Sequence, residues 1–121
     1  MKSRLFLVAL LIVSLSLVSA FALQSGKQKA DPNVRSVDGA VEDPSGKPVE
    51  GAVVQLKNAR TLQVRSFISQ RDGTYYFHGL STDVDYELKA EYQGSASSPR
   101  TLSVFDSRKN PRINLRLEPK K

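Results

Sequence analysis

Hydrophobic residues at every second position, in short runs separated by turn-forming residues, constrain the fold of this chain most strongly. The clearest run is Tyr86–Tyr92, in which Tyr86, Leu88, Ala90 and Tyr92 alternate with charged residues. A period of two places apolar side chains on one face of a strand, whereas a helix needs a period near 3.6. Beyond the N-terminal apolar segment, no stretch has helical spacing. The sequence therefore predicts an all-β domain.

The same alternation predicts seven short strands. Turn signals rich in Asp, Pro, Ser and Gly, such as Asp43–Gly46 and Gln70–Gly73, separate them. Gly79–Asp85 is expected to form a polar loop and 93–98 a small-residue turn. The connections are too short for crossover helices, which favours antiparallel pairing in a seven-stranded Greek-key β-sandwich. The expected strands are 34–42, 52–57, 62–69, 74–78, 86–92, 100–105 and 113–118.

The N-terminus has the layout of a secretory signal peptide. Lys2 and Arg4 precede the apolar stretch Leu5–Val18, and Ala20-Phe21-Ala22 matches the small-residue pattern before a cleavage site. The sequence thus predicts a signal-peptide helix over 1–22 and a secreted or periplasmic protein. The alternative is an uncleaved membrane anchor, because Leu5–Leu23 approaches the roughly 20 residues that a spanning helix needs.

The remaining chain divides into three predicted parts and is large enough for one domain. A flexible linker is expected over 23–33, the β-sandwich over 34–118 and a basic tail over 119–121. The chain contains no cysteine, so neither disulfides nor a lipid-modified cysteine can stabilise or anchor it. Two of its 18 basic residues lie in the predicted signal peptide, and the mildly basic remainder does not have the composition of a nucleic-acid-binding domain.

Two segments carry a family resemblance. Val41–Leu56 (VEDPSGKPVEGAVVQL) and Asp72–Leu80 (DGTYYFHGL), with Tyr86-Glu87-Leu88 after them, resemble the carboxypeptidase regulatory-like domain, a transthyretin-like sandwich with a carbohydrate-binding-like fold. The resemblance extends over about 34–118. It implies an accessory domain of the kind found with metallocarboxypeptidases, outer-membrane receptors and polysaccharide-active proteins.

Several motif residues are expected to serve the fold. Tyr75 and Phe77 share one face of their strand and are predicted core residues. Gly46 and Gly73 are expected to close hairpins, and Gly51 to allow two backbones to approach closely.

Enzyme chemistry is not predicted, and neither a metal site nor a cofactor is expected. His78 is the only histidine of the chain. A zinc carboxypeptidase needs at least two histidines and a glutamate, and a non-haem iron dioxygenase with this architecture uses two tyrosines and two histidines. A hydroxyisourate hydrolase would end in Tyr-Arg-Gly-Ser, whereas this chain ends in Leu117-Glu118-Pro119-Lys120-Lys121.

Two pairs of side chains are candidate ligand-binding residues. Tyr76 and His78 lie opposite Phe77 on their strand, where a ring and an imidazole could stack on a sugar; ordinary cross-strand packing is the alternative. Arg112 and Arg116 lie on one face and could attract an anionic polymer; protection of a terminal edge strand is the alternative.

Together these patterns favour a non-catalytic structural or protein-interaction module at the cell envelope. The alternative function is a carbohydrate-binding module that recognises a cell-surface or extracellular polysaccharide. The expected partner is an envelope protein or a polysaccharide rather than nucleic acid, and no membrane span is expected to remain after cleavage of the signal peptide.

Overall fold

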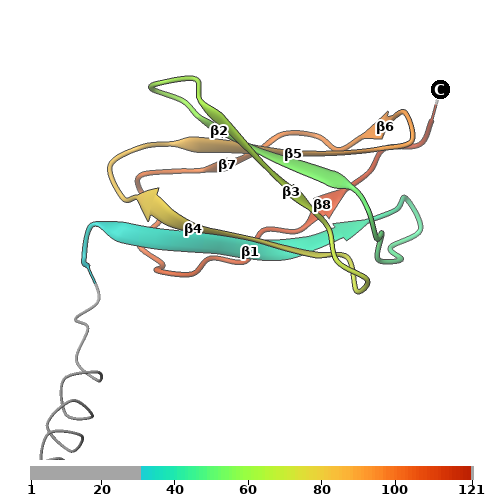
Figure 1. The fold of residues 1–121 in the computed structure, drawn as a ribbon, viewed down its shortest axis with the longest axis horizontal. Coiled ribbons are helices and arrows are strands. Elements are labelled where there is room, and N and C mark those ends of the chain that lie inside the picture. Colours follow the sequence, from blue (N-terminus) through green and yellow to red (C-terminus); the bar gives the residue numbers. More distant parts are fainter. Residues whose placement is uncertain (1–30, 121) are drawn as a thin grey trace, which may run out of the picture. The chain divides into compact units, whose positions relative to one another are not determined.

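The computed structural model describes residues 31–120, which form a sandwich of two β-sheets (Figure 1). The predicted signal peptide, the membrane-anchor alternative and most of the predicted linker lie outside the described residues. Within the described part of the chain, no helix is long and apolar enough to cross a membrane. The strands are β1 Val34–Glu42, β2 Val53–Asn58, β3 Val64–Ile68, β4 Thr74–Ser81, β5 Tyr86–Tyr92, β6 Ser95–Ala96, β7 Arg100–Leu102 and β8 Leu115–Arg116.

The predicted all-β sandwich is confirmed, with eight strands among the described residues rather than seven. The first sheet has the order β4-β1-β8, and the second has the order β3-β2-β5-β6, with β7 also pairing with β5. The additional strand, β6, arises because Gln93 and Gly94 both adopt positive φ, at 48° and 82°. Two such residues in succession close a tight hairpin, so the expected small-residue turn returns the chain onto β5.

The expectation of purely antiparallel pairing is wrong for the last strand. β8 pairs with β1 in parallel, with Val41 opposite Leu115, and a parallel bridge joins Asp38 to Arg112. The connection that makes this pairing possible runs from β7 in one sheet to β8 in the other. A connection that changes sheets does not have to return over the face of its own sheet, so it needs no crossover helix.

The fourth strand is longer than the pattern predicted, because Gly79 lies within β4 instead of ending it. The β1–β4 register shifts between Arg35 and Val37, and Gly79 adopts a φ of 68° at this irregularity. An extra residue in one strand of an antiparallel pair resets the alternation. Leu80 is therefore buried, and the expected polar loop begins only after Ser81.

The predicted strand over 100–105 is too long, because β7 ends at Leu102. The backbone turns at this point, and the amide of Asp106 donates a hydrogen bond to the carbonyl of Ser103 at 3.1 Å. The amide of Val104 donates to Oδ1 of Asp85 at 2.7 Å instead of continuing a strand ladder. Phe105 consequently lies outside the sheet.

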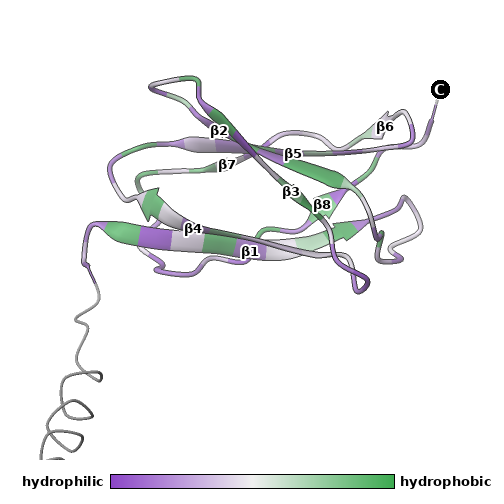
Figure 2. Ribbon diagram, in the orientation of Figure 1, coloured by the Kyte–Doolittle hydropathy of each residue, from purple (hydrophilic) through white to green (hydrophobic). Residues whose placement is uncertain are grey.

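The core lies between the two sheets and confirms the predicted inward faces. Tyr75 and Phe77 are buried on β4, as are Tyr86 and Leu88 on β5. From Val37 to Val41 every second residue of β1 is buried, and hydrophobic and hydrophilic bands are visible along this strand in Figure 2. The same alternation continues through the C-terminal segment, where Ile113, Leu115 and Leu117 are buried and the residues between them are exposed.

Phe77→Ala is expected to lower the free energy of unfolding by about 3 kcal/mol, through lost burial and the cavity that remains. The Phe77 ring packs edge-on against Phe67 at 6.1 Å between centroids and against Tyr75 at 6.0 Å. Chemical denaturation monitored by circular dichroism measures the change. Tyr76→Ala is the matched control on the opposite side of β4, and an equal loss in both variants would contradict the inward position of Phe77.

Candidate functional site

The outward face of the sheet β4-β1-β8 brings together all four candidate ligand-binding residues. This surface, called the outer face below, is reached by every second side chain of β4, of β1 and of the C-terminal segment 110–117. The intervening side chains are buried, so the alternation itself directs the polar residues outward. The outer face carries Tyr76 and His78 from β4, Asp38 and Glu42 from β1, and Arg112, Asn114 and Arg116 from the C-terminal segment.

Tyr76 and His78 form an aromatic pair on this face. Their rings are nearly parallel, with an interplanar angle of 18° and 5.7 Å between centroids. The Tyr76 side chain is 49% exposed, and His78 is also exposed. The two rings hold each other in position, and together they present apolar surface beside polar edges.

A polar row continues across the sheet from this aromatic pair. Tyr76 lies opposite Asp38 in the β1–β4 register, and Asp38 in turn lies opposite Arg112. The Nη1 atom of Arg112 is 3.8 Å from Oδ2 of Asp38. An aromatic ring, a carboxylate and a guanidinium therefore lie at one level of the sheet, on β4, on β1 and on the C-terminal segment beside β1.

The other arginine is paired in the same way. The Nη2 atom of Arg116 donates to Oε2 of Glu42 at 3.1 Å. Between the two arginines, Oδ1 of Asn114 accepts a hydrogen bond from the backbone amide of Ala40 at 3.0 Å. The polar side chains of the C-terminal segment thus follow the parallel register along β1.

These pairs change the electrostatic character of the outer face. The sequence pattern treats Arg112 and Arg116 as a basic patch, but each lies against an acidic side chain of β1. Asp72 adds a further carboxylate near Arg112: its pKa is lowered mainly by the hydroxyl and amide of Thr74, with a smaller contribution from Arg112. The face combines charges of both signs rather than a uniform positive potential.

Sequence reasoning missed Asp38, which links the two candidate pairs. It belongs to the polar side of the β1 alternation, but its neighbours in space come from β4 and from the C-terminal segment. The structure also has an open hollow of about 600 Å³ on the other sheet, beside the β5–β6 hairpin. This hollow is lined partly by Tyr92 and contains none of the four predicted residues.

Among residues 31–120, no group of three or more His, Cys, Asp or Glu side chains is arranged to hold a metal ion.

The chain resembles solved structures of different activities. It matches catechol 1,2-dioxygenase from Acinetobacter sp. ADP1 with a TM-score of 0.52 and 11% identity, over 76% of this chain and 54% of that one. It matches the major pilin subunit of Bacillus cereus with a TM-score of 0.56 and 10% identity, over 72% of this chain and 30% of that one.

A candidate carbohydrate-binding protein of Pseudomonas aeruginosa matches with a TM-score of 0.50 and 15% identity, over 69% of this chain and 88% of that one. This chain therefore spans about half of the dioxygenase and less than a third of the pilin. Identities this low show a shared fold and no shared activity. No curated protein sequence matches the chain.

The sequence itself matches one family. The model of the carboxypeptidase regulatory-like domain covers residues 36–118, which include all strands of the sandwich except the first two residues of β1. The match confirms the resemblance carried by the Val41–Leu56 and Asp72–Leu80 motifs. The chain belongs to the carboxypeptidase regulatory-like domain family.

Proposed function

We propose that this protein is an exported, non-catalytic module that binds an uncharged polysaccharide at the cell envelope through its outer face. One observation carries the proposal: the tyrosine, histidine and two arginines that the sequence offers as two separate candidates lie on one face, where Asp38 lies between Tyr76 and Arg112. Sequence patterns alone favour a structural role, and this convergence is the reason for placing binding first.

The chemistry of the outer face suits a sugar chain. Pyranose rings have apolar faces that stack on aromatic side chains and hydroxyls that exchange hydrogen bonds with carboxylates, guanidinium groups and amides. Tyr76 supplies an exposed ring, and Asp38 and Arg112 supply an acceptor and a donor at the same level of the sheet. Because each arginine is paired with an acid, an uncharged polymer fits this face better than a polyanion.

The family and the candidate residues support a non-catalytic role. The matching family is a regulatory-like domain. His78 is the only histidine of the chain, and its imidazole stacks on Tyr76. The similarity to a dioxygenase at 11% identity concerns the fold alone. Export is supported by the charged start, apolar stretch and Ala20-Phe21-Ala22 pattern of the N-terminus.

Tyr76→Ala is expected to weaken binding to a neutral polysaccharide about tenfold or more, because a stacking anchor is typically worth at least ~1.4 kcal/mol. Isothermal titration calorimetry measures the affinity at low and at high salt, and the affinity should change little between these two conditions. Tyr92→Ala, in the hollow of the other sheet, is the matched control. Binding that survives Tyr76→Ala but is lost in Tyr92→Ala would place the site elsewhere, and affinity that falls steeply with salt would indicate an acidic ligand.

A protein-interaction role is the second candidate, and strand β3 favours it. β3 is an edge of its sheet, and Val64 and Ile68 are exposed on it. An exposed apolar edge strand can accept a strand from another chain. Ile68→Lys should then abolish co-purification of an envelope partner and leave polysaccharide binding intact, whereas Tyr76→Ala should have the opposite effects.

A further inference from the structure

Three loops meet at one end of the sandwich, called the loop end below. They are 58–63, 82–85 and 103–109, and hydrogen bonds connect them. The amide of Ala59 donates to the carbonyl of Asp85 at 3.0 Å, and Oδ1 of Asp85 accepts from the amide of Val104 at 2.7 Å. The described part of the chain also begins at this end (Figure 1). There, Nζ of Lys109 donates to the carbonyl of Pro32 at 2.9 Å.

The loop end exposes large apolar side chains that packing does not explain. Phe105 is 92% exposed and Leu62 is 66% exposed, while Val104 and Val34 are partly exposed nearby. Leu62 also adopts a φ of 63°, a conformation that is unfavourable for a residue with a branched side chain. A glycine or asparagine would fit this backbone better, so neither conformation nor burial accounts for a leucine here.

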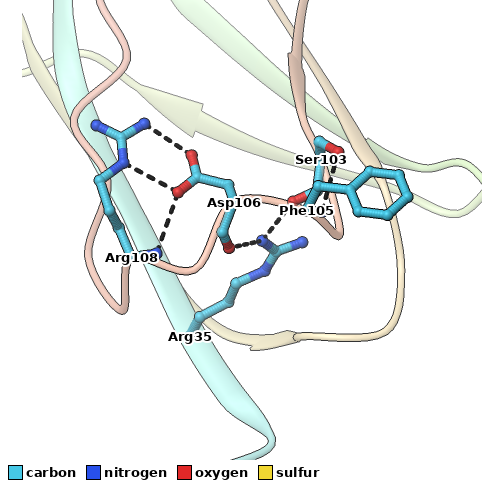
Figure 3. Close-up of polar contacts among 5 residues, drawn as sticks. All are labelled: Arg35, Ser103, Phe105, Asp106 and Arg108. Carbon is cyan, nitrogen blue, oxygen red and sulfur yellow. Dashed lines mark hydrogen bonds and ion pairs between the residues drawn. The ribbon is translucent and has the colours of Figure 1, made fainter.

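A buried arginine holds the loop that carries Phe105. Arg35 is only 3% exposed and extends from β1 beneath the loop (Figure 3). Its Nη1 atom donates to the carbonyls of Ser103 at 2.8 Å and Asp106 at 3.4 Å. Phe105 lies between these two residues, so its backbone is fixed on both sides. A loop whose backbone is already fixed loses little backbone entropy when it binds.

A second contact lies within the same loop, on its exposed side. Nε and Nη2 of Arg108 donate to the two carboxylate oxygens of Asp106 at 2.9 and 2.7 Å (Figure 3). These bonds, with the amide of Arg108, lower the pKa of Asp106 to about 2. The Phe105 loop is therefore ordered by two independent sets of contacts in the free protein.

The charges at the loop end do not identify an ionic partner. Basic and acidic side chains occur there in similar number, so the surface does not favour a strongly charged polymer. The basic residues at the surface are Arg60, Arg108 and Lys109, and the acidic residues are Asp31, Asp83, Asp85 and Asp106, while Arg35 is buried. Protruding apolar side chains on a charge-balanced surface fit an apolar phase instead.

The chain before Asp31 indicates which apolar phase is close. The apolar segment Leu5–Leu23 is predicted to enter a membrane, either as a signal peptide or as an anchor. The residues between Leu23 and Asp31 can extend over at most about 30 Å. While that segment is attached, the start of the domain, and with it the loop end, stays near the bilayer surface.

We propose that the loop end is a membrane-docking surface, which inserts Phe105 and Leu62 into the interfacial region of a lipid bilayer. The rigid loop presents the aromatic ring, and Leu62 provides a second point of insertion. Docking in this orientation leaves the outer face at the side of the domain, on strands that run away from the loop end.

The test uses the absence of tryptophan from the chain. Phe105→Trp, made in the chain from Leu23 onward, places a single fluorescent reporter at the loop. Vesicles of phosphatidylcholine should shift its emission to shorter wavelength and increase its intensity. Tyr76→Trp on the outer face is the matched control, and its emission should not change.

A second pair of variants measures the contribution of insertion. Phe105→Ser should reduce co-sedimentation with the same vesicles about tenfold or more, because the apolar ring is no longer there to be removed from water. Adding Leu62→Gly to Phe105→Ser should reduce co-sedimentation further. Both side chains are exposed, so the melting temperature should be retained, and a circular dichroism scan confirms that the variants are folded.

Three results would overturn the proposal. The first is tryptophan emission from the Phe105→Trp variant that stays at the water-exposed wavelength in the presence of vesicles. The second is a blue shift that already occurs without lipid and depends on protein concentration, which would identify a second copy as the partner. The third is binding that requires phosphatidylglycerol, disappears at high salt and is unaffected by Phe105→Ser, which would indicate headgroup charge alone.

Discussion

Gly39→Ala is expected to lower the free energy of unfolding by about 4 kcal/mol or more, one of the largest effects of any single substitution in this domain. A Cβ atom at position 39 would overlap the carbonyl oxygen of Ile113 and would lie 2.8 Å from Cε1 of Tyr75. Neither the Ile113 carbonyl nor the Tyr75 ring can move away easily. The amide of Ile113 donates to the carbonyl of Asp38 at 2.8 Å, and the Tyr75 hydroxyl donates to the Ile113 carbonyl.

The cost arises from the arrangement around Gly39. Tyr75 lies opposite Gly39 in the β1–β4 register, and its ring crosses the glycine to reach the C-terminal segment on the other side. Burial raises the pKa of the Tyr75 hydroxyl, which keeps it protonated as the donor of this hydrogen bond. An added methyl group would have to separate β1 from the segment that carries Ile113.

Chemical denaturation measures the loss, and Gly79→Ala is the matched control. Gly79 has a φ of 68° but no atom within 4 Å of the position that a Cβ would occupy. Its substitution should cost only the backbone strain of a left-handed alanine, about 1–2 kcal/mol. If Gly39→Ala costs no more than Gly79→Ala, the C-terminal segment does not lie as close to β1 as the structure indicates.

The inward face of each strand could be predicted because alternation is a local property. The sequence alone assigns Phe77 to the core and Tyr76 to the surface, and the structure confirms both. Pairing between strands is not local. The parallel match of β8 with β1 depends on a connection that changes sheets, and turn chemistry carries no signal for such a change. Gly79 likewise has the sequence signature of a turn, although it serves as an irregularity inside a strand.

The same distinction explains the candidate site. The sequence pattern places Tyr76 and Arg112 at exposed positions, and both are exposed. Their common face could not be predicted, because β1 lies between them and supplies Asp38 to both. Whether these residues bind a ligand stays a prediction, as do the signal peptide over 1–22 and the linker over 23–33.

Arg35 shows where local reasoning ends. Extending the β1 alternation backward from Val37 places Arg35 on the inward side, a position where a charged residue is rarely found. Its hydrogen-bond acceptors are all backbone carbonyls, which any residue type could supply. No particular side chain in the sequence therefore marks the partners of Arg35, and its contacts could not be predicted.

Arg35→Ala is expected to lower the free energy of unfolding by about 3–5 kcal/mol, an effect comparable to that of Gly39→Ala. The guanidinium group satisfies four carbonyls from two separate segments, 81–84 and 103–106. Besides Ser103 and Asp106, it donates to Ser81 at 3.1 Å and to Val84 at 2.8 Å. Removing the guanidinium group leaves carbonyl oxygens without a donor and an empty space beneath the loop end. Both effects raise the free energy of the folded state.

Arg35→Lys and Arg108→Ala separate the possible causes. Lysine keeps the charge but cannot form the planar set of bonds that guanidinium makes, so it should recover only part of the stability. Arg108→Ala removes a solvent-exposed ion pair from the same loop and should cost less than about 1 kcal/mol. Chemical denaturation ranks the free energies of unfolding of the three variants.

Arg35→Ala should also lower the fluorescence anisotropy of the tryptophan in the Phe105→Trp variant, because the loop loses its internal support. Unchanged anisotropy together with a large loss of stability would mean that Arg35 supports the core but not the Phe105 loop, and the preorganisation argued for membrane docking would then be wrong.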